Sequence, residues 1–534
     1  EPSAAETPGG SGASRRSPFA AMRSVAGLTL VSRVLGFVRD VVMASLLGAS
    51  AVSDAFFLAW LLPNLMRRLF GEGAFAAALI PVFIDARESG NEAEARRLVS
   101  AATTRLALVL LALIVVGEVA LTWGLGYVHE PAPGWPRLHR ALAGAELTLE
   151  LARVLLPYLG FICLAGVLGG ALNALDRFAI PAVAPVLLNL IWIAALAVGA
   201  ALYPEAERRV NVLVWGLVAA GVAQFTIHLV ACHRAALPVA PRWKTDPALL
   251  KRVRSLFFSL ALGLTVFQLN VLFDSLIAYA FVPAGGVTAL YYGNRLIQLP
   301  IGVLGVALST VVFPQLARLA KRGDFAGLGA VLDQGIRIGL YVSLPAAVGL
   351  AVLYVPIVDV LFGHGEFDAD SVRRTGGVLL CLTPAVVAAC LTPVLARAFY
   401  AEELTRIPVY VSVFCVLVNL TLNLTLVTPL EEMGLALSTS ISQCLNLLLL
   451  SVFSRRRRAA RDDLPRTGDT LRGLSAFFAL ALAMGGVAFL VQHVLPLPGG
   501  VRLALAVGLG VVVYLGGSRL FRIRELTLLL SRGR

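Results

Sequence analysis

The sequence predicts an all-α polytopic membrane protein, and three observations support that fold class. Hydrophobic residues make up 58% of the 534-residue chain, and the mean hydropathy is +0.83. Charged residues make up only 14%, against about 25% in ordinary soluble domains. Apolar segments of about 20 residues, the length that crosses a bilayer core, recur along nearly the whole chain. These features exclude a water-soluble enzyme, a disordered scaffold and a disulfide-stapled secreted module.

Fourteen apolar segments are long enough to be transmembrane helices, and several contain Pro and Gly, which neighbouring helices accommodate in lipid. Residues 1–17 are small, polar and rich in Pro and Gly. We expect them to be disordered, and they lack the apolar region of a signal peptide. The predicted helices cover residues 24–47, 52–84, 101–126, 150–173, 178–202, 208–233, 255–281, 286–318, 336–361, 375–400, 407–428, 433–454, 473–493 and 501–521.

Basic residues in the loops predict the orientation of the chain. The 45 Lys and Arg residues outnumber the 32 Asp and Glu residues, and the formal net charge is +13. With fourteen spans, the basic N-terminal arm, the loops after the sixth and twelfth helices, and the tail all fall on one side. Opposite loops such as SAVS and FVPAGG are nearly free of bases. The positive-inside rule therefore places both termini in the cytoplasm.

The first twelve predicted helices form two copies of one six-helix unit. Residues 156–181 resemble residues 383–408, with Pro157 matching Pro384, and Gly90 matches Gly323 in another pair of segments. Both copies begin on the same side, so the lobes are parallel and enclose a central cavity, as in transporters. The predicted division is a disordered cytoplasmic arm (1–21), an N-lobe (22–234), a basic linker (235–252), a C-lobe (253–455), a basic loop (456–471), two C-terminal helices (472–522) and a cytoplasmic tail (523–534).

Ionisable and polar side chains inside predicted helices mark a candidate substrate site, because such groups are costly in a membrane. Arginines outnumber carboxylates in this set, which favours an anion, and guanidinium groups bind phosphate bidentately. Internal ion pairs, with some arginines reaching back to the interface, are the structural alternative. The candidate substrate-binding residues are Arg33, Arg39, Asp40, Asp54, Asn64, Arg67, Arg68 and Arg295.

A second polar group lies in the C-lobe and is a candidate cation site. Asp274, Asn419, Asn423 and Thr439 offer oxygen ligands with a single carboxylate. That set suits Na⁺ better than Ca²⁺, and Asp274 alone could instead carry a proton. Interhelical hydrogen bonding is the structural alternative. The six cysteines have no paired spacing and are interpreted as packing residues, and no catalytic or nucleotide-binding motif is present.

Three stretches resemble the MurJ (MviN-like) lipid II flippase family of the multidrug/oligosaccharidyl-lipid/polysaccharide exporter superfamily. They are SRVLGFVRDVVMASLLGAS (32–50), SDAFFLAWLLPNLMRRLFGEGAFAAALIPVF (53–83) and YYGNRLIQLPIGVLGVALSTVVFP (291–314). The resemblance implies fourteen helices, two lobes, and two C-terminal helices lining a groove for a lipid tail. It also implies functional roles for Arg33, Arg39, Asp40, Asp54, Arg67 and Arg295, and a sodium site that adds the carbonyl of Leu435. In the family site, where described, one of the two eleventh-helix ligands is an aspartate, whereas this chain has asparagine at both positions, Asn419 and Asn423.

The resemblance implies a transporter, not an enzyme, that moves lipid II across the bacterial cytoplasmic membrane for peptidoglycan synthesis by alternating access. We expect Arg39, Arg67 and Arg295 to hold the diphosphate, with Asp40 and Asp54 orienting or releasing them. The expected partners are lipid II and membrane lipids. The chain is expected to be a monomer that binds no nucleic acid and has no cofactor beyond Na⁺ or H⁺ coupling. The alternatives are an exporter of another lipid-linked oligosaccharide, a cation-coupled drug exporter and a membrane-embedded glycosyltransferase.

Overall fold

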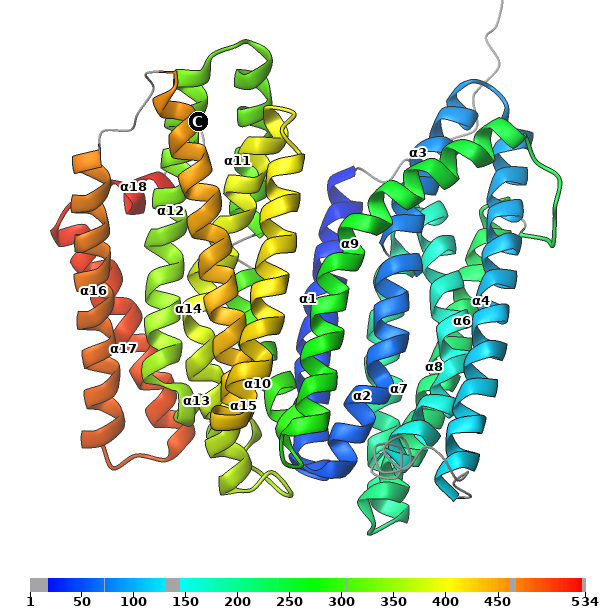
Figure 1. The fold of residues 1–534 in the computed structure, drawn as a ribbon, viewed down its shortest axis with the longest axis horizontal. Helices are drawn as coiled ribbons and strands as arrows, with labels where there is room; N and C mark the ends of the chain where they lie inside the picture. The colour runs from blue at the N-terminus through cyan, green and yellow to red at the C-terminus, as the bar shows by residue number, and fades with distance from the viewer. Residues whose placement is uncertain are drawn as a thin grey trace, which may run out of the picture.

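The computed structural model describes residues 18–71, 73–129, 145–237, 239–302, 306–461 and 467–530, and these residues form helices joined by short loops. The predicted disorder of residues 1–17 lies outside the described residues. Two groups of upright helices stand side by side and converge at one end (Figure 1). The predicted all-helical class with two lobes is confirmed.

The first helical group contains most of the N-terminal half of the chain and has an aromatic core. Phe56, Trp60, Tyr158 and Trp192 pack together, with ring centroids 5.1–6.3 Å apart. The group comprises α1 (Pro18–Leu47), α2 (Ala51–Met66), the π-helix η1 (Arg67–Gly71), α3 (Ala74–Glu88), α4 (Glu92–His129), α6 (Glu146–Ala174), α7 (Ala179–Leu202) and α8 (Ala206–Arg234).

The second group contains a long helix, α15, that is a hairpin of two helices. The backbone of Glu431 is non-helical, with φ of 50°, so residues 407–428 and 433–454 form the two arms that the hydropathy predicts. Helices α16 and α17 lie at the outer edge, next to α12 (Figure 1). The group comprises α10 (Gly286–Pro300), α11 (Val306–Lys321), α12 (Phe325–Val352), α13 (Tyr354–Phe362), α14 (Ala369–Ala401), α15 (Arg406–Ala459), α16 (Thr467–Val494), α17 (Gly499–Leu520) and α18 (Arg524–Leu530).

Helix α9 (Pro247–Phe281) connects the two groups by crossing from one to the other (Figure 1). Asp246 caps its N-terminus by accepting a hydrogen bond from the backbone of Ala248 at 2.8 Å. Val253 and Phe257 pack in the core of the first group, whereas the other end of α9 contacts α15. The sequence-based division places the start of the C-lobe at residue 253. The first turns after that residue, which include Val253 and Phe257, pack on the first group.

The turns that follow corresponding helices support the internal repeat. Gly90, between α3 and α4, has φ of 81°, and its counterpart Gly323, between α11 and α12, has φ of 69°. Asp176 and Glu403, which also correspond, have φ of 57° and 62°. Left-handed backbone is uncommon outside glycine, so its recurrence at matched positions reflects one supersecondary unit used twice.

Within the described residues, ten helices are long and apolar enough to cross a bilayer. One of them is the α15 hairpin, and another joins α2, η1 and α3. Each of the fourteen predicted segments overlaps a helix. The count of fourteen membrane crossings stays a prediction.

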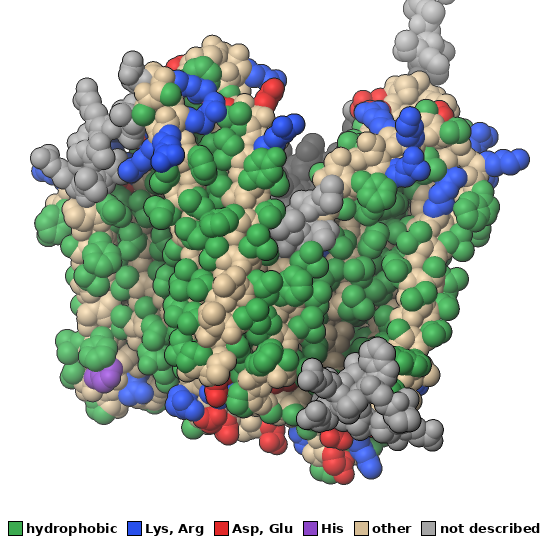
Figure 2. Space-filling model, in the orientation of Figure 1, with side chains coloured by type: hydrophobic (Ala, Val, Ile, Leu, Met, Phe, Trp, Pro, Cys, Tyr) green, Lys and Arg blue, Asp and Glu red, His purple; other side chains and the backbone are tan. Residues whose placement is uncertain are grey.

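The two ends of the molecule differ in charge and in packing. Lys and Arg side chains gather at one end, which we call the basic end, and the surface is hollowed there between the two groups (Figure 2). The loop between α8 and α9, which carries Arg242 and Lys244, and the C-terminal end of α15, which carries Arg457, lie at this end (Figure 1). At the opposite end, which we call the closed end, the groups touch through the loops around Gly48, Gly285 and Gly365.

Candidate functional site

Asp40 of α1 lies at the centre of a polar cluster where the two helical groups meet. Its side chain is 1% exposed and accepts hydrogen bonds from an arginine of each group. Arg39 Nη2 lies 2.6 Å from Asp40 Oδ1, and Arg295 Nε of α10 lies 2.7 Å from Asp40 Oδ2. Two guanidinium groups therefore share one carboxylate, and the cluster keeps a net positive charge. We call Arg39, Asp40 and Arg295 the arginine seam.

Helix α7 fixes the position of Arg39 from behind. Asn189 Oδ1 accepts a hydrogen bond from Arg39 Nη1 at 3.2 Å, and Asn189 Nδ2 donates to the carbonyl of Ser32 at 3.1 Å. The guanidinium carbon of Arg39 lies 4.3 Å from the ring centroid of Trp192, a cation–π arrangement. Tyr291 of α10 is within 3.4 Å of Arg39 Nη2. Arg39 therefore contacts α7 and α10 in addition to Asp40.

Arg33 and Arg295 are less enclosed than Arg39. The Arg295 side chain is 34% exposed, and among the described residues only its Nε forms a hydrogen bond. Arg33, two turns from Asp40 on α1, is exposed and lies beside Gly302 at the end of α10. The guanidinium groups of Arg33 and Arg295 are therefore more accessible than that of Arg39.

Arg67 and Arg68 lie farther toward the basic end, where α2 changes into η1. Pro63 cannot donate a backbone hydrogen bond, and the chain widens into a π-helix that begins at Arg67. Arg67 Nη2 donates to Asn64 Oδ1 at 3.0 Å, and Arg68 is exposed. At 1.5 Å per residue, Arg67 is about 20 Å along the helix from Asp54.

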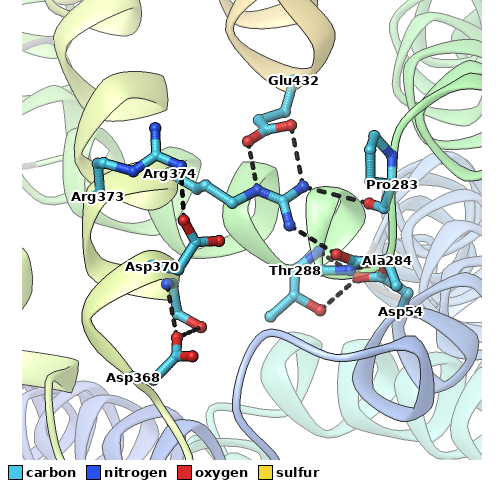
Figure 3. Close-up of polar contacts among 11 residues, drawn as sticks. Asp54, Pro283, Ala284, Thr288, Asp368, Asp370, Arg373, Arg374 and Glu432 are labelled. Carbon is cyan, nitrogen blue, oxygen red and sulfur yellow. Dashed lines mark hydrogen bonds and ion pairs between the residues drawn. The ribbon is translucent and has the colours of Figure 1, made fainter.

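Asp54 does not join the arginines, although the sequence analysis groups it with them. It is 5% exposed and lies at the closed end, where it accepts hydrogen bonds from the first turn of α10. The donors are the backbone N–H of Gly285 at 2.7 Å, the backbone N–H of Thr288 at 2.8 Å and Thr288 Oγ1 at 2.6 Å (Figure 3). Backbone donors at a helix N-terminus stabilise a carboxylate, so Asp54 joins the two groups and does not face the hollow.

Backbone atoms also meet directly across the closed end. The N–H of Glu366 donates to the carbonyl of Ser45 at 2.9 Å. Gly48, Gly285 and Gly365 all have positive φ, and a Cβ on any of them would collide with a carbonyl oxygen of the other group. Those carbonyls belong to Glu366, Ala49 and Ser45 respectively. Glycine is therefore required both for the local conformation and for the close approach of the groups.

The candidate cation site is partly assembled, and its carboxylate is held by amides. Asn423 Nδ2 donates to Asp274 and, at 3.0 Å, to Asn419 Oδ1, while Asn270 Nδ2 donates to Asp274 at 3.2 Å. Thr439 Oγ1 donates to the carbonyl of Leu435 at 3.1 Å, within the second arm of α15. The structure thus brings Asp274, Asn419 and Asn423 together as a hydrogen-bonded group, with Asn423 Oδ1 buried and unpartnered among the described residues.

Sequence reasoning missed four residues that shape these sites, namely Asn189, Trp192, Tyr291 and Thr288. Asn189 carries a usable signal, because it is a lone amide within the apolar run PVLLNLIW. The other three are ordinary helix residues whose importance comes from partners more than 150 positions away. Only the three-dimensional packing of α1, α2, α7 and α10 identifies them.

The fold and the seam together define a class of protein. The fold matches a solved structure titled "Inward-facing conformation of a multidrug resistance MATE family transporter of the MOP superfamily", with a TM-score of 0.66 at 15% identity, over 82% of this chain and 98% of that one. It also matches one titled "Lipid II flippase MurJ, inward closed conformation", with a TM-score of 0.74 at 22% identity, over 94% and 99%. The chain therefore has the two-lobed helical fold of these two structures.

Sequence comparison defines the family. The family model described as "Lipid II flippase MurJ" matches residues 43–508. The chain is 35% identical over 432 residues to the "Probable lipid II flippase MurJ" of Vibrio cholerae, covering 80% of this chain and 81% of that protein. It is 33% identical over 445 residues to the "Lipid II flippase MurJ" of Burkholderia cenocepacia, covering 82% and 84%. The chain belongs to the MurJ lipid II flippase family, which is a family of transporters and not of enzymes.

Proposed function

We propose that this protein moves the head group of lipid II across the membrane by alternating access between its two lobes. The observation that carries the proposal is the arginine seam, in which each helical group contributes one guanidinium to a shared carboxylate. A diphosphate brings more negative charge than one carboxylate, and its oxygens match the planar fork of arginine. It can therefore bind the open donors of Arg33 and Arg295 and compete with Asp40 for the two arginines.

The seam is placed so that substrate binding can be coupled to lobe movement. Arg39 and Asp40 lie about two turns before the end of α1 at Leu47, and the contacts of the closed end begin at Gly48, the next residue. When a diphosphate draws Arg39 and Arg295 away from Asp40, it removes one tie between the groups. The hydrogen bonds from the backbone of Gly285 and Thr288 to Asp54 must then also break before the closed end can open.

We propose that Arg67, Arg68 and Asn64 form the entry to this path. They lie between the basic end and the seam, on the group that also carries Arg39. An anionic head group arriving from the basic end would meet Arg68 and Arg67 before Arg33 and the seam. Asp54 acts as a closing residue and not as a substrate ligand.

We propose that the basic end faces the bacterial cytoplasm, with both termini on that side. Arginine clusters mark the cytoplasmic ends of helices, and Figure 2 shows Lys and Arg gathered at that end. Moving negative charge outward is then favoured by the membrane potential by about 2.3 kcal/mol per charge per 100 mV. The transport path lies within one chain, so we propose that a monomer, embedded among membrane lipids, is the working unit.

We propose that Asp274 binds a proton in the cycle in preference to Na⁺. Its oxygens already accept amide hydrogens from Asn270 and Asn423. A sodium ion needs oxygen ligands at those positions, so the amide of Asn423 would have to turn around. A proton needs no such rearrangement.

Depletion of the protein from cells tests the proposed function. We expect lipid II to accumulate with its head group on the cytoplasmic face, measured by the accessibility of the head group to an impermeant enzyme or probe at the outer face. Unchanged outward exposure of lipid II after depletion would rule out the flippase role.

A further inference from the structure

One peptide group at the closed end lies between an anion and a cation. The N–H of the Ala284–Gly285 peptide donates to Asp54 Oδ2 at 2.7 Å. The carbonyl of the same peptide, on Ala284, accepts from Arg374 Nη1 of α14 at 2.6 Å. Figure 3 shows Arg374 reaching toward Ala284 and Asp54 from the second helical group. Asp54 and Arg374 therefore interact with the two ends of one amide dipole.

Arg374 is itself held from behind by Glu432. Arg374 Nε and Nη2 lie 2.7 and 3.1 Å from the two carboxylate oxygens of Glu432, a bidentate pair. The two side chains are 13% and 3% exposed. Glu432 sits at the hairpin turn of α15, next to Glu431, whose backbone makes that turn. The tip of the hairpin thus fixes the direction in which the guanidinium points.

The remaining donors of Arg374 hold the loop that joins α9 to α10. Nη2 also donates to the carbonyl of Pro283 at 3.2 Å, next to the bond from Nη1 to Ala284. The guanidinium of Arg374 therefore donates hydrogen bonds to the carboxylate of Glu432 on one side and to the backbone carbonyls of Pro283 and Ala284 on the other. This use of Nε, Nη1 and Nη2 requires a planar fork, which lysine lacks.

We propose that Arg374, fixed by Glu432, is a positioning residue of the closed end. By holding the carbonyls of Pro283 and Ala284, it aims the N–H of Gly285 at Asp54 and polarises the amide that Asp54 binds. Hydrogen bonds that share a polarised group strengthen one another in a low-dielectric site. Among the described residues, Arg374 forms no hydrogen bond to the first helical group, so it acts on the contact between the lobes through the loop that it holds. The inference rests on the proposed alternating access, because it assigns Arg374 to the step in which the closed end opens.

The charge-exchanged pair Arg374→Glu with Glu432→Arg separates this role from that of a simple ion pair. The exchange keeps opposite charges on α14 and α15, but a carboxylate at position 374 cannot donate to Pro283 or Ala284. If Arg374 serves only to pair with Glu432, the exchange restores the closed end. If Arg374 positions the loop, the exchange is as disruptive as Arg374→Gln.

A buried cysteine reports the opening of the closed end in purified protein. Thr148 of α6 is buried and donates to Tyr279 of α9 across the junction of the groups at 2.9 Å. We would place Thr148→Cys in a background with the six native cysteines replaced by alanine, reconstitute it in lipid nanodiscs, and measure its labelling rate with a maleimide. The rate is proportional to the open fraction when opening is fast.

Arg374→Gln and the exchanged pair should each raise the labelling rate about tenfold, the effect expected from losing one charge-assisted hydrogen bond. Arg337→Gln is the matched control, because Arg337 pairs with Glu525 at 2.6 Å within the second group, away from the closed end, and its rate should equal that of the parent. If Arg374→Gln fails to fold, Arg374→Lys, which keeps the charge, should still raise the rate.

Two results would overturn the inference. One is a parental labelling rate in the exchanged pair, and the other is a parental rate in Arg374→Gln or Arg374→Lys. Labelling requires no lipid II, so a failure of the flippase proposal would appear in the depletion assay and leave the labelling result standing.

Discussion

Two aspartates of the first helical group, Asp40 and Asp54, both join it to the second group but do so by different means. Asp40 is held by guanidinium side chains, whereas Asp54 is held by backbone N–H groups and a threonine at the start of α10. A phosphate can compete for arginine side chains, but it has no access to backbone donors enclosed between the lobes. In the proposed mechanism, substrate therefore acts at Asp40, whereas the hydrogen bonds of Asp54 break only when the lobes separate.

Removal of the seam arginines should have the largest effect on function. We expect Arg39→Ala and Arg295→Ala each to lower lipid II translocation by about two orders of magnitude, since each loses charge-assisted hydrogen bonds worth about 1.5–3 kcal/mol apiece. Growth complementation in a depletion strain, with membrane levels checked by immunoblot, measures this. Arg337→Ala should complement fully. Full complementation by both seam variants would remove the seam from the mechanism.

Glycine substitutions should break the closed end selectively. Gly365→Ala introduces a Cβ that collides with the carbonyl of Ser45 across the junction, at a residue with φ of 62°. Gly323→Ala is a matched control, since its φ is 69° but a Cβ there meets nothing within 4 Å. Left-handed strain of about 1–2 kcal/mol applies to both. Only Gly365→Ala should raise the labelling rate of Thr148→Cys, by an order of magnitude or more, and equal rates in the two variants would refute the role of glycine at the junction.

At the site around Asp274, we expect the wild type to show no effect of Na⁺ on its melting temperature and a substitution to introduce one. We expect the melting temperatures of the wild type in Na⁺ and in K⁺ to lie within about 1 °C of each other. The reason is that the Asp274 carboxylate already accepts hydrogen bonds from the side-chain amides of Asn270 and Asn423. Asn423→Asp adds a second carboxylate to the site and should gain a Na⁺-specific rise in melting temperature of a few degrees. Addition of Asp274→Ala should abolish that rise. A Na⁺-specific rise in the wild type that Asp274→Ala eliminates would instead establish a native sodium site.

The smallest expected effect lies at the N-terminus of α14, outside the membrane-spanning segment. Asp368 accepts hydrogen bonds from the N–H and the hydroxyl of Ser371, which hold the pKa of Asp368 below its usual value. Asp368→Ala should lower the free energy of unfolding by about 1 kcal/mol. The contribution of the cap is present above the unfolded pKa of about 3.9 and is lost as the pH falls through the lower folded pKa. Denaturant unfolding at neutral and acidic pH checks both statements, and an undiminished stability at neutral pH would contradict the first.

The sequence predicts those features that local pattern determines. Hydropathy locates the apolar segments, the matched Pro and Gly positions reveal the two lobes, and lone charges identify Arg39, Asp40 and Arg295. It cannot separate Asp40 from Asp54, because both are single carboxylates in neighbouring helices and their partners in the second group lie more than 200 residues away. The same holds for Arg374, whose sequence context is an ordinary helix start, and for Val253, whose packing on the first group depends on the path of α9.

The affinity of purified protein for lipid II most directly tests whether the seam binds a diphosphate. Wild type, Arg295→Ala and the control Arg337→Ala would be compared in nanodiscs, with a lipid-linked monophosphate as a second ligand. We predict that Arg295→Ala weakens lipid II binding by about 10- to 100-fold, the equivalent of one or two charge-assisted hydrogen bonds, that Arg337→Ala has no effect, and that the monophosphate binds more weakly to the wild type. Equal affinity of Arg295→Ala and wild type for lipid II would contradict the central claim.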